Sequence, residues 1–136
     1  MATIQTLYLG DYRTEITHVQ SGNKVITDAP TDNNGKGEYI SPTDMVAAAL
    51  GSCMLTLMAI ASQRLDIDLK GTRVEIQKIM AANPRRIAEI RLDFYLPGDY
   101  DAKSKKILEG AAETCPVGKS LHPDLRQTVH FHYAAE

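Results

Sequence analysis

The sequence contains few cysteines and no excess of basic residues. Only Cys53 and Cys115 occur in 136 residues, whereas a small secreted domain held together by disulfides would have more. Lys and Arg number 15 against 17 Asp and Glu, which gives a net charge of −2. The chain therefore lacks the basic surface expected of a protein whose main partner is nucleic acid or an anionic membrane.

Targeting and membrane signals are also missing from the sequence. Residues 1–5 have neither the basic segment nor the apolar segment of a signal peptide. The longest apolar run, residues 45–61, is interrupted by Gly51, Ser52 and Thr56, and it is shorter than the roughly 20 residues of a membrane-spanning helix. We expect a cytosolic protein with no membrane span, a compartment where a cysteine pair is more often catalytic or redox-active than structural.

The hydrophobic pattern predicts an α+β fold in a single domain over residues 1–136. Alternating residues indicate strands, arranged as antiparallel hairpins, and two segments have helical spacing. The predicted strands cover residues 3–9, 12–20, 24–27, 73–80, 87–96 and 126–133, and the predicted helices cover residues 41–65 and 101–115. In the fifth strand, even-numbered residues 88–96 should face inward and Glu89, Arg91 and Asp93 outward.

The long helix has a clear start signal. Ser41 suits the N-cap, Pro42 the first helical position, and Asp44 the third, where a carboxylate can close a capping box. The apolar residues that follow surround the helix axis, so the helix should be buried on most sides.

Each cysteine can be interpreted as a structural residue or as a reactive thiol. Cys53 is either a small buried apolar residue or a reactive thiol beside Gly51-Ser52, which are poor helix formers. Cys115 is either an incidental residue at a helix end or, because Pro116 follows it, the cap of a helical turn whose free N–H groups favour a thiolate.

Other polar residues also have two interpretations. Arg13 alone reads as a solvated charge, and Asp44 as a capping residue. A metal site could combine His130 and His132, which point the same way on a strand, with His122 or an acid. Gly35-Lys36-Gly37 does not match a phosphate-binding loop.

Two motifs together resemble the OsmC/Ohr family of osmotically inducible and organic hydroperoxide resistance proteins. They are Ser41-Pro42-Thr43-Asp44-Met45-Val46-Ala47-Ala48-Ala49-Leu50-Gly51-Ser52-Cys53 and Cys115-Pro116-Val117-Gly118-Lys119-Ser120-Leu121. The segments Tyr8-Leu9-Gly10-Asp11-Tyr12-Arg13 and Thr27-Asp28-Ala29-Pro30 are similar to the family's N-terminal sheet. The resemblance, to the OsmC-like branch, covers nearly the whole chain.

The resemblance implies a thiol-dependent peroxidase that reduces organic hydroperoxides in oxidative stress defence. It implies Cys53 as the peroxidatic cysteine, Cys115 as the resolving one and Arg13 as the arginine that holds the thiolate. The implied protein is an intertwined homodimer with antiparallel sheets on a central helix. It needs no cofactor and is restored by an external thiol or dithiol.

Apolar residues around Cys53 should favour organic hydroperoxides over hydrogen peroxide. We expect Met45, Met54 and Leu57 to provide them. One position departs from the hydroperoxide-resistance branch, because Thr43 stands where that branch has a glutamate paired with the arginine. Either Asp44 replaces this glutamate or the site lacks it.

Two alternatives remain on the same sequence. One is a thiol redox sensor or apolar-ligand binder without catalysis, and the other is the histidine metal site. The apolar helix further predicts an obligate homodimer, in which the N-terminal sheet of one subunit covers the helix of the other.

Overall fold

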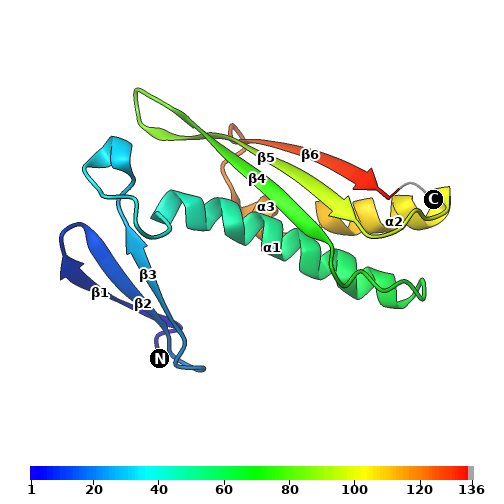
Figure 1. Ribbon diagram of the computed structural model, residues 1–136, viewed down its shortest axis with the longest axis horizontal. Coiled ribbons are helices and arrows are strands. Elements are labelled where there is room, and N and C mark those ends of the chain that lie inside the picture. The colour runs from blue at the N-terminus through cyan, green and yellow to red at the C-terminus, as the bar shows by residue number, and fades with distance from the viewer. Residues whose placement is uncertain (135–136) are drawn as a thin grey trace. The chain divides into compact units, whose positions relative to one another are not determined.

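The computed structural model describes residues 1–134, which form two compact units, Met1–Met45 and the chain from Val46 onward. The first unit contains β1 (Ile4–Gly10), β2 (Arg13–His18), β3 (Lys24–Asp28) and the short helix η1 (Thr31–Asn33). Helix α1 (Pro42–Gln63) begins at the end of this unit. The second unit adds β4 (Arg73–Ala81), β5 (Arg86–Leu96), α2 (Ala102–Glu113), α3 (Pro116–Ser120) and β6 (Arg126–Tyr133) (Figure 1). The predicted α+β class is confirmed.

The first unit is an antiparallel meander in the order β1-β2-β3. Its first hairpin turns at Asp11 and Tyr12, which both have positive φ, 55° and 62°. Two consecutive residues of this kind make the tight turn whose twist suits a two-residue hairpin. The predicted hairpin is therefore confirmed, with its turn one residue later than the Gly10-Asp11 signal.

A loop of residues 29–40 follows β3 and closes back on it. The Asp28 N–H donates to the Ile40 carbonyl at 3.1 Å, and the Gly35 N–H donates to the Pro30 carbonyl at 3.0 Å. A Cβ on Gly35 would lie 1.6 Å from the Ala29 carbonyl oxygen, so only glycine fits there. The loop is thus a defined structure that returns its far end to β3.

The start of α1 is the predicted capping box. The Asp44 N–H donates to Ser41 Oγ at 3.1 Å, and the Ser41 N–H donates to Asp44 Oδ2 at 3.3 Å. Each residue thus satisfies a backbone donor of the other. Ser41 is itself 2% exposed, which shields both bonds from water.

Within one chain, α1 buries a single face. That face contacts the second sheet and consists of Ala47, Leu50, Gly51, Met54, Met58 and Ser62. Other sides remain open to solvent, and Ile60 is 56% exposed. The expectation of burial on most sides is wrong for the single chain. By length and composition α1 could also cross a membrane, a test that the core helix of a soluble protein passes equally.

The second sheet has the order β4-β5-β6 and is mixed. Strands β4 and β5 are antiparallel, as predicted, and their turn includes a cis Asn83-Pro84 bond. Strand β6 pairs with β5 in parallel, so this sheet is not wholly antiparallel. The connection between them carries α2 and α3, as a parallel crossover requires.

Strand β5 forms the centre of the core. Ile90, Leu92 and Phe94 are each 0% exposed and face α1 and α2, which confirms the predicted inward face. Glu89 is an exception to the predicted outward face, since it is only 9% exposed. Its carboxylate accepts hydrogen bonds from the Thr128 hydroxyl at 2.6 Å and from Arg91 Nε at 3.1 Å, which compensates its burial.

Candidate functional site

The two cysteines come together in the second unit from different elements. Cys53 is half-buried in the middle of α1, and Cys115 is 2% exposed just before α3. Both are free thiols, and a hydrogen bond between the two side chains contributes to a raised pKa of Cys115. The structure therefore places the two predicted cysteines next to each other, although 61 residues (54–114) separate them in the sequence.

Cys115 is the N-cap of α3, as the following proline predicted. Pro116 occupies the first turn, and Cys115 Sγ accepts a hydrogen bond from the Gly118 N–H at 3.5 Å. Burial, followed by the hydrogen bond with Cys53, raises the pKa of the Cys115 thiol, and the Gly118 and Val117 N–H groups only partly oppose this. The cap is confirmed, but burial and the neighbouring Cys53 outweigh its lowering effect, so the pKa of Cys115 is raised and not lowered as expected.

The absence of a side chain at Gly118 lets α3 approach its neighbours. A Cβ at this position would lie 2.9 Å from Gln127 Oε1 and 3.4 Å from Leu50 Cδ1. The Gln127 amide also donates to the Gly118 carbonyl at 3.0 Å. Contacts with α1 and β6 thus hold α3, and with it Cys115, against the helix that carries Cys53.

An apolar pocket of about 430 Å³ borders this pair of elements. Its lining residues are Val46, Ala49, Pro116, Val117, Ser120 and Leu121. Ala49 lies one helical turn before Cys53, and Pro116 directly follows Cys115. Ser120 is the one polar side chain among these lining residues, and its hydroxyl donates to the Pro116 carbonyl at 2.8 Å. Met54, predicted as lining, is instead 3% exposed in the core.

Arg13 belongs to a polar cluster in the first unit. Its Nη2 donates to Asp28 Oδ2 at 3.4 Å and to Glu38 Oε1, and its guanidinium lies 5.0 Å from the centre of the Tyr39 ring. The Arg13 side chain is 25% exposed, and the Asp28 side chain is 0% exposed. Arg13 is therefore a fixed, ion-paired residue and not the solvated charge that its position alone suggested.

Asp28 and Glu38 were not identified as site residues from the sequence. In the sequence, the Thr27-Asp28-Ala29-Pro30 segment carries the family resemblance and no other signal. The structure buries both Thr27 and Asp28 at the end of the edge strand β3, a feature that alternation along the strand does not reveal. Nothing in the local pattern marks Glu38, which reaches Arg13 only because the loop of residues 29–40 folds back.

Asp44, a predicted site residue, has its carboxylate on the backbone of Ser41. The carboxylates that accept from Arg13 are those of Asp28 and Glu38. The capping interpretation of Asp44 is thus confirmed, and its part in a reactive site stays a prediction.

His122 and His132 have ordinary polar partners. His132 Nε2 is 2.8 Å from Asp93 Oδ1, and its ring stacks on Tyr95 at 4.7 Å between centroids. His122 Nδ1 accepts from the Asp124 N–H at 3.0 Å. Across residues 1–134, no group of three or more His, Cys, Asp or Glu side chains could hold a metal ion. The alternative of a histidine metal site therefore gains no support.

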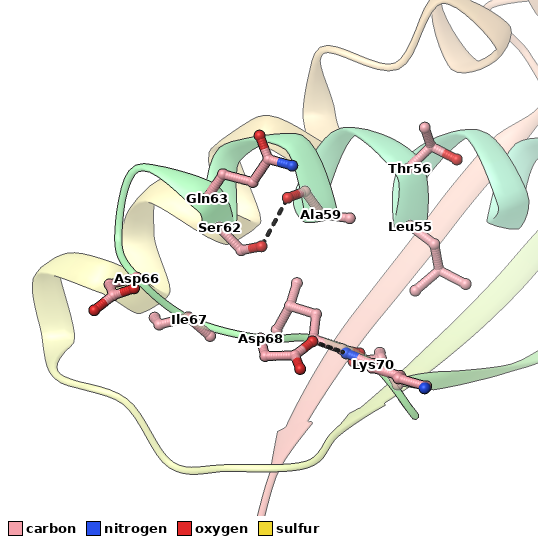
Figure 2. Close-up of a pocket in the computed structure, with 11 residues that line it drawn as sticks. Leu55, Thr56, Ala59, Ser62, Gln63, Asp66, Ile67, Asp68 and Lys70 are labelled. Carbon is pink, nitrogen blue, oxygen red and sulfur yellow. Dashed lines mark hydrogen bonds between the residues drawn. The ribbon is translucent and has the colours of Figure 1, made fainter.

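A second pocket, of about 710 Å³, lies at the C-terminal end of α1 (Figure 2). Its polar groups bond within the chain: Ser62 Oγ donates to the Ala59 carbonyl at 2.7 Å, and the Lys70 N–H donates to Asp68 Oδ1 at 2.9 Å. Neither cysteine lines it. The smaller pocket is not lined by a cysteine either, but its lining residues Ala49 and Pro116 are near neighbours of Cys53 and Cys115 in the chain.

Comparison with known proteins gives a consistent result. The family model described as OsmC-like protein matches residues 35–129. A crystal structure from Psychrobacter arcticus, a putative osmotic stress induced and detoxification response protein, is 48% identical with a TM-score of 0.94, over 97% of this chain and 96% of that one. No curated protein sequence gives a significant match.

More distant structures share the fold. An organic hydroperoxide resistance protein OsmC from Legionella pneumophila is 15% identical with a TM-score of 0.74, over 97% of this chain and 99% of that one. An organic hydroperoxide resistance protein from Elizabethkingia anophelis is 16% identical with a TM-score of 0.71, over 98% of both chains.

Proposed function

Because the chain belongs to the OsmC-like protein family, we propose that it is a thiol-dependent peroxidase that reduces organic hydroperoxides through Cys53 and Cys115. Its relatives, some of them organic hydroperoxide resistance proteins, support a role in peroxide or osmotic stress defence. The observation that supports a peroxidase activity through these cysteines is the pair of adjacent free thiols near an apolar pocket.

The proposed reaction has three balanced steps. The Cys53 thiolate attacks the O–O bond of the hydroperoxide, and the alkoxide leaves as the alcohol after taking a proton, which forms a sulfenic acid on Cys53. The Cys115 thiol attacks this sulfur, so that a disulfide forms and water leaves. An external dithiol then reduces the disulfide by exchange and is itself oxidised.

The different settings of the two thiols support this assignment of roles. Cys53 is half-buried and can be approached by a substrate, whereas Cys115 is almost fully buried and needs to meet only Cys53. The raised pKa of Cys115 keeps it a neutral thiol, which suits the second step because the sulfenic oxygen needs a proton to leave as water.

Arg13 is proposed as the cation that stabilises the Cys53 thiolate and binds a peroxide oxygen. A guanidinium stays charged at a partly buried position and presents several donors in one plane. Its ion pairs with Asp28 and Glu38 show that the first unit fixes this side chain in place.

We also propose that the protein acts as a homodimer. The first unit exposes many large apolar side chains: Ile4, Leu7, Tyr8, Leu9, Tyr12, Val25, Tyr39 and Ile40. The open sides of α1, including Ile60, add to this surface. A second copy would cover both surfaces, because in a two-fold symmetric interface every contact made by one subunit is repeated by the other.

The test measures peroxide consumption with a dithiol supplied in excess. Wild type should turn over cumene hydroperoxide faster than hydrogen peroxide because the pocket beside the thiols is apolar. Cys53→Ser should abolish turnover, whereas Cys115→Ser, assayed without the dithiol, should consume one equivalent of peroxide and stop at a sulfenic acid that dimedone traps. Sustained turnover by Cys53→Ser would sink the assignment.

A redox sensor on the same fold is the second candidate, which the burial of Cys115 favours because its disulfide would be poorly accessible to reductants. It predicts that wild type consumes one equivalent of peroxide and forms the Cys53–Cys115 disulfide. No further consumption should then follow with either a monothiol or a dithiol. The same assay therefore separates the two candidates.

A further inference from the structure

We propose that Asp28 is a positioning residue that anchors Arg13 permanently, whereas Glu38 is an exchangeable partner that the reacting anion displaces. The inference rests on the proposed function, in which Arg13 serves the Cys53 thiolate. It assigns different roles to two carboxylates that bind the same guanidinium nitrogen.

The two carboxylates differ sharply in exposure. The Asp28 side chain is 0% exposed, whereas that of Glu38 is 56% exposed. An exposed ion pair contributes little because water solvates both charges well, so it exchanges readily. A buried carboxylate that loses its cation is left as an uncompensated charge, so the Asp28 pair should persist.

Asp28 also organises the backbone around Arg13. Its Oδ2 accepts from Arg13 Nη2 at 3.4 Å and from the Glu38 N–H at 3.1 Å. The Asp28 N–H in turn donates to the Ile40 carbonyl at 3.1 Å. Through its carboxylate and its backbone N–H, Asp28 therefore links the guanidinium to the far end of the loop that carries Glu38.

Unused hydrogen-bonding atoms lie on the same two residues. In the described part of the chain, Arg13 Nε and Asp28 Oδ1 are buried and have no hydrogen-bond partner. Buried polar atoms are rarely left unpaired in a folded protein, so such a pair of atoms indicates a site that is completed by another group.

The arrangement leaves Arg13 with free donors for that group. Both carboxylates bind Nη2, so in the residues described here the hydrogen-bond donors on Nε and Nη1 remain available. These donors can bind a thiolate sulfur or a peroxide oxygen while the Asp28 carboxylate stays bound to Nη2. An anion that arrives competes electrostatically with Glu38, which can move into solvent.

Two substitutions can show whether a carboxylate holds Arg13 in position or only adds negative charge beside it. The two roles predict opposite shifts in the pH at which Cys53 ionises. Removal of any negative charge near Arg13 strengthens its positive potential and should lower the pH at which Cys53 becomes a thiolate. Loss of the anchor lets Arg13 leave its place and should raise that pH. We expect Glu38→Gln to show the first effect and Asp28→Asn the second.

The measurement is the pH profile of Cys53 alkylation by iodoacetamide in a Cys115→Ser background. Asp28→Asn should move the midpoint upward by about one pH unit, a roughly tenfold loss of thiolate at neutral pH, and should slow the single reaction with cumene hydroperoxide accordingly. Glu38→Gln should move the midpoint downward. Glu15→Gln is the matched control, because Glu15 lies on β2 with Arg13 but pairs with Lys24 of β3, and it should leave the midpoint unchanged.

A downward shift in both Asp28→Asn and Glu38→Gln would overturn the proposal, because Asp28 would then act only as a charge. If Asp28→Asn fails to fold by circular dichroism, Glu38→Gln still decides, since an upward shift contradicts an exchangeable role. Absence of peroxide turnover in wild type, with these alkylation shifts intact, would refute the proposed function but not the roles of Asp28 and Glu38.

Discussion

Two thiols of the same chain lie in different surroundings, and their chemistry should differ accordingly. Cys53 is half-buried on α1, whereas Cys115 is enclosed at the start of α3. Burial and the neighbouring thiol raise the pKa of Cys115 above its ordinary value of 9.0. In the reduced protein Cys115 should therefore remain protonated at pH values where an exposed cysteine has begun to ionise.

This raised pKa predicts a pH-dependent contribution to stability. The folded state holds the Cys115 proton more tightly than the unfolded state, so the contribution is fully present below the unfolded pKa and is lost as pH rises through the folded pKa. The stability difference between reduced wild type and Cys115→Ala should shrink from pH 7 to pH 10. Urea unfolding with excess reductant at several pH values measures it.

A control is needed because the pKa of Tyr133 is also raised, mainly by burial and by its hydrogen bond with Glu109. Tyr133→Phe removes this second alkaline titration, and the Cys115 effect should persist in that background. A stability difference that stays constant across the pH range would show that Cys115 ionises equally in both states.

At the scale of single residues, local rules predicted some features and missed others. The Cys115 cap follows from Pro116, since proline constrains the residue before it. The partners of Arg13 could not be predicted, because Glu38 lies 25 residues away and reaches Arg13 through a loop. Such contacts depend on tertiary structure that no local pattern encodes.

The element that begins with the capping box gives a second prediction. Ser41→Ala removes the hydroxyl that accepts from the Asp44 N–H and should lower the free energy of unfolding by about 1 kcal/mol. Ser41→Thr keeps the hydroxyl and should retain much of that stability. Urea unfolding of the three proteins at neutral pH tests this.

The same helix start separates the two roles suggested for Asp44. If Asp44 only caps α1, Asp44→Ala should destabilise the protein while the cumene hydroperoxide rate of the folded protein stays the same. A large rate loss at a temperature where the variant is fully folded would instead show that Asp44 takes part in the reaction.

At the scale of elements, the positions of strands were more predictable than their pairing. Alternation on β5 identified its buried face because side chains alternate with period two. Alternation does not report strand direction, so the parallel pairing of β6 escaped prediction. The burial of Glu89 was missed for a related reason, since it depends on the Thr128 hydroxyl of that parallel neighbour.

For the whole molecule, we expect a homodimer. Each large apolar side chain left in water costs roughly 1.5–3 kcal/mol relative to burial, and the first unit exposes many of them. A stable interface should exceed about 2,000 Å² in total. Sedimentation at low micromolar concentration should show one species of 30 kDa, twice the 15.0 kDa chain.

A charged substitution provides the matched test of the dimer. Ile60→Glu places a carboxylate on the open side of α1, where the side chain is 56% exposed, so it should leave the fold of the single chain intact. It should shift the sedimenting species toward 15 kDa if this side meets a second copy. A folded wild-type monomer at these concentrations would contradict the proposal.

The parallel pairing of β5 and β6 also has a consequence for the order of folding. Hairpin β4–β5 joins neighbouring segments, but β6 can pair only after the 97–125 connection has closed, and distant pairings form more slowly because the chain entropy must be lost first. Cys115 lies on that connection. A newly made chain in which β6 has not yet docked would therefore hold Cys53 on a helix without Cys115, its proposed resolving partner, and in peroxide such chains should be the ones exposed to irreversible overoxidation.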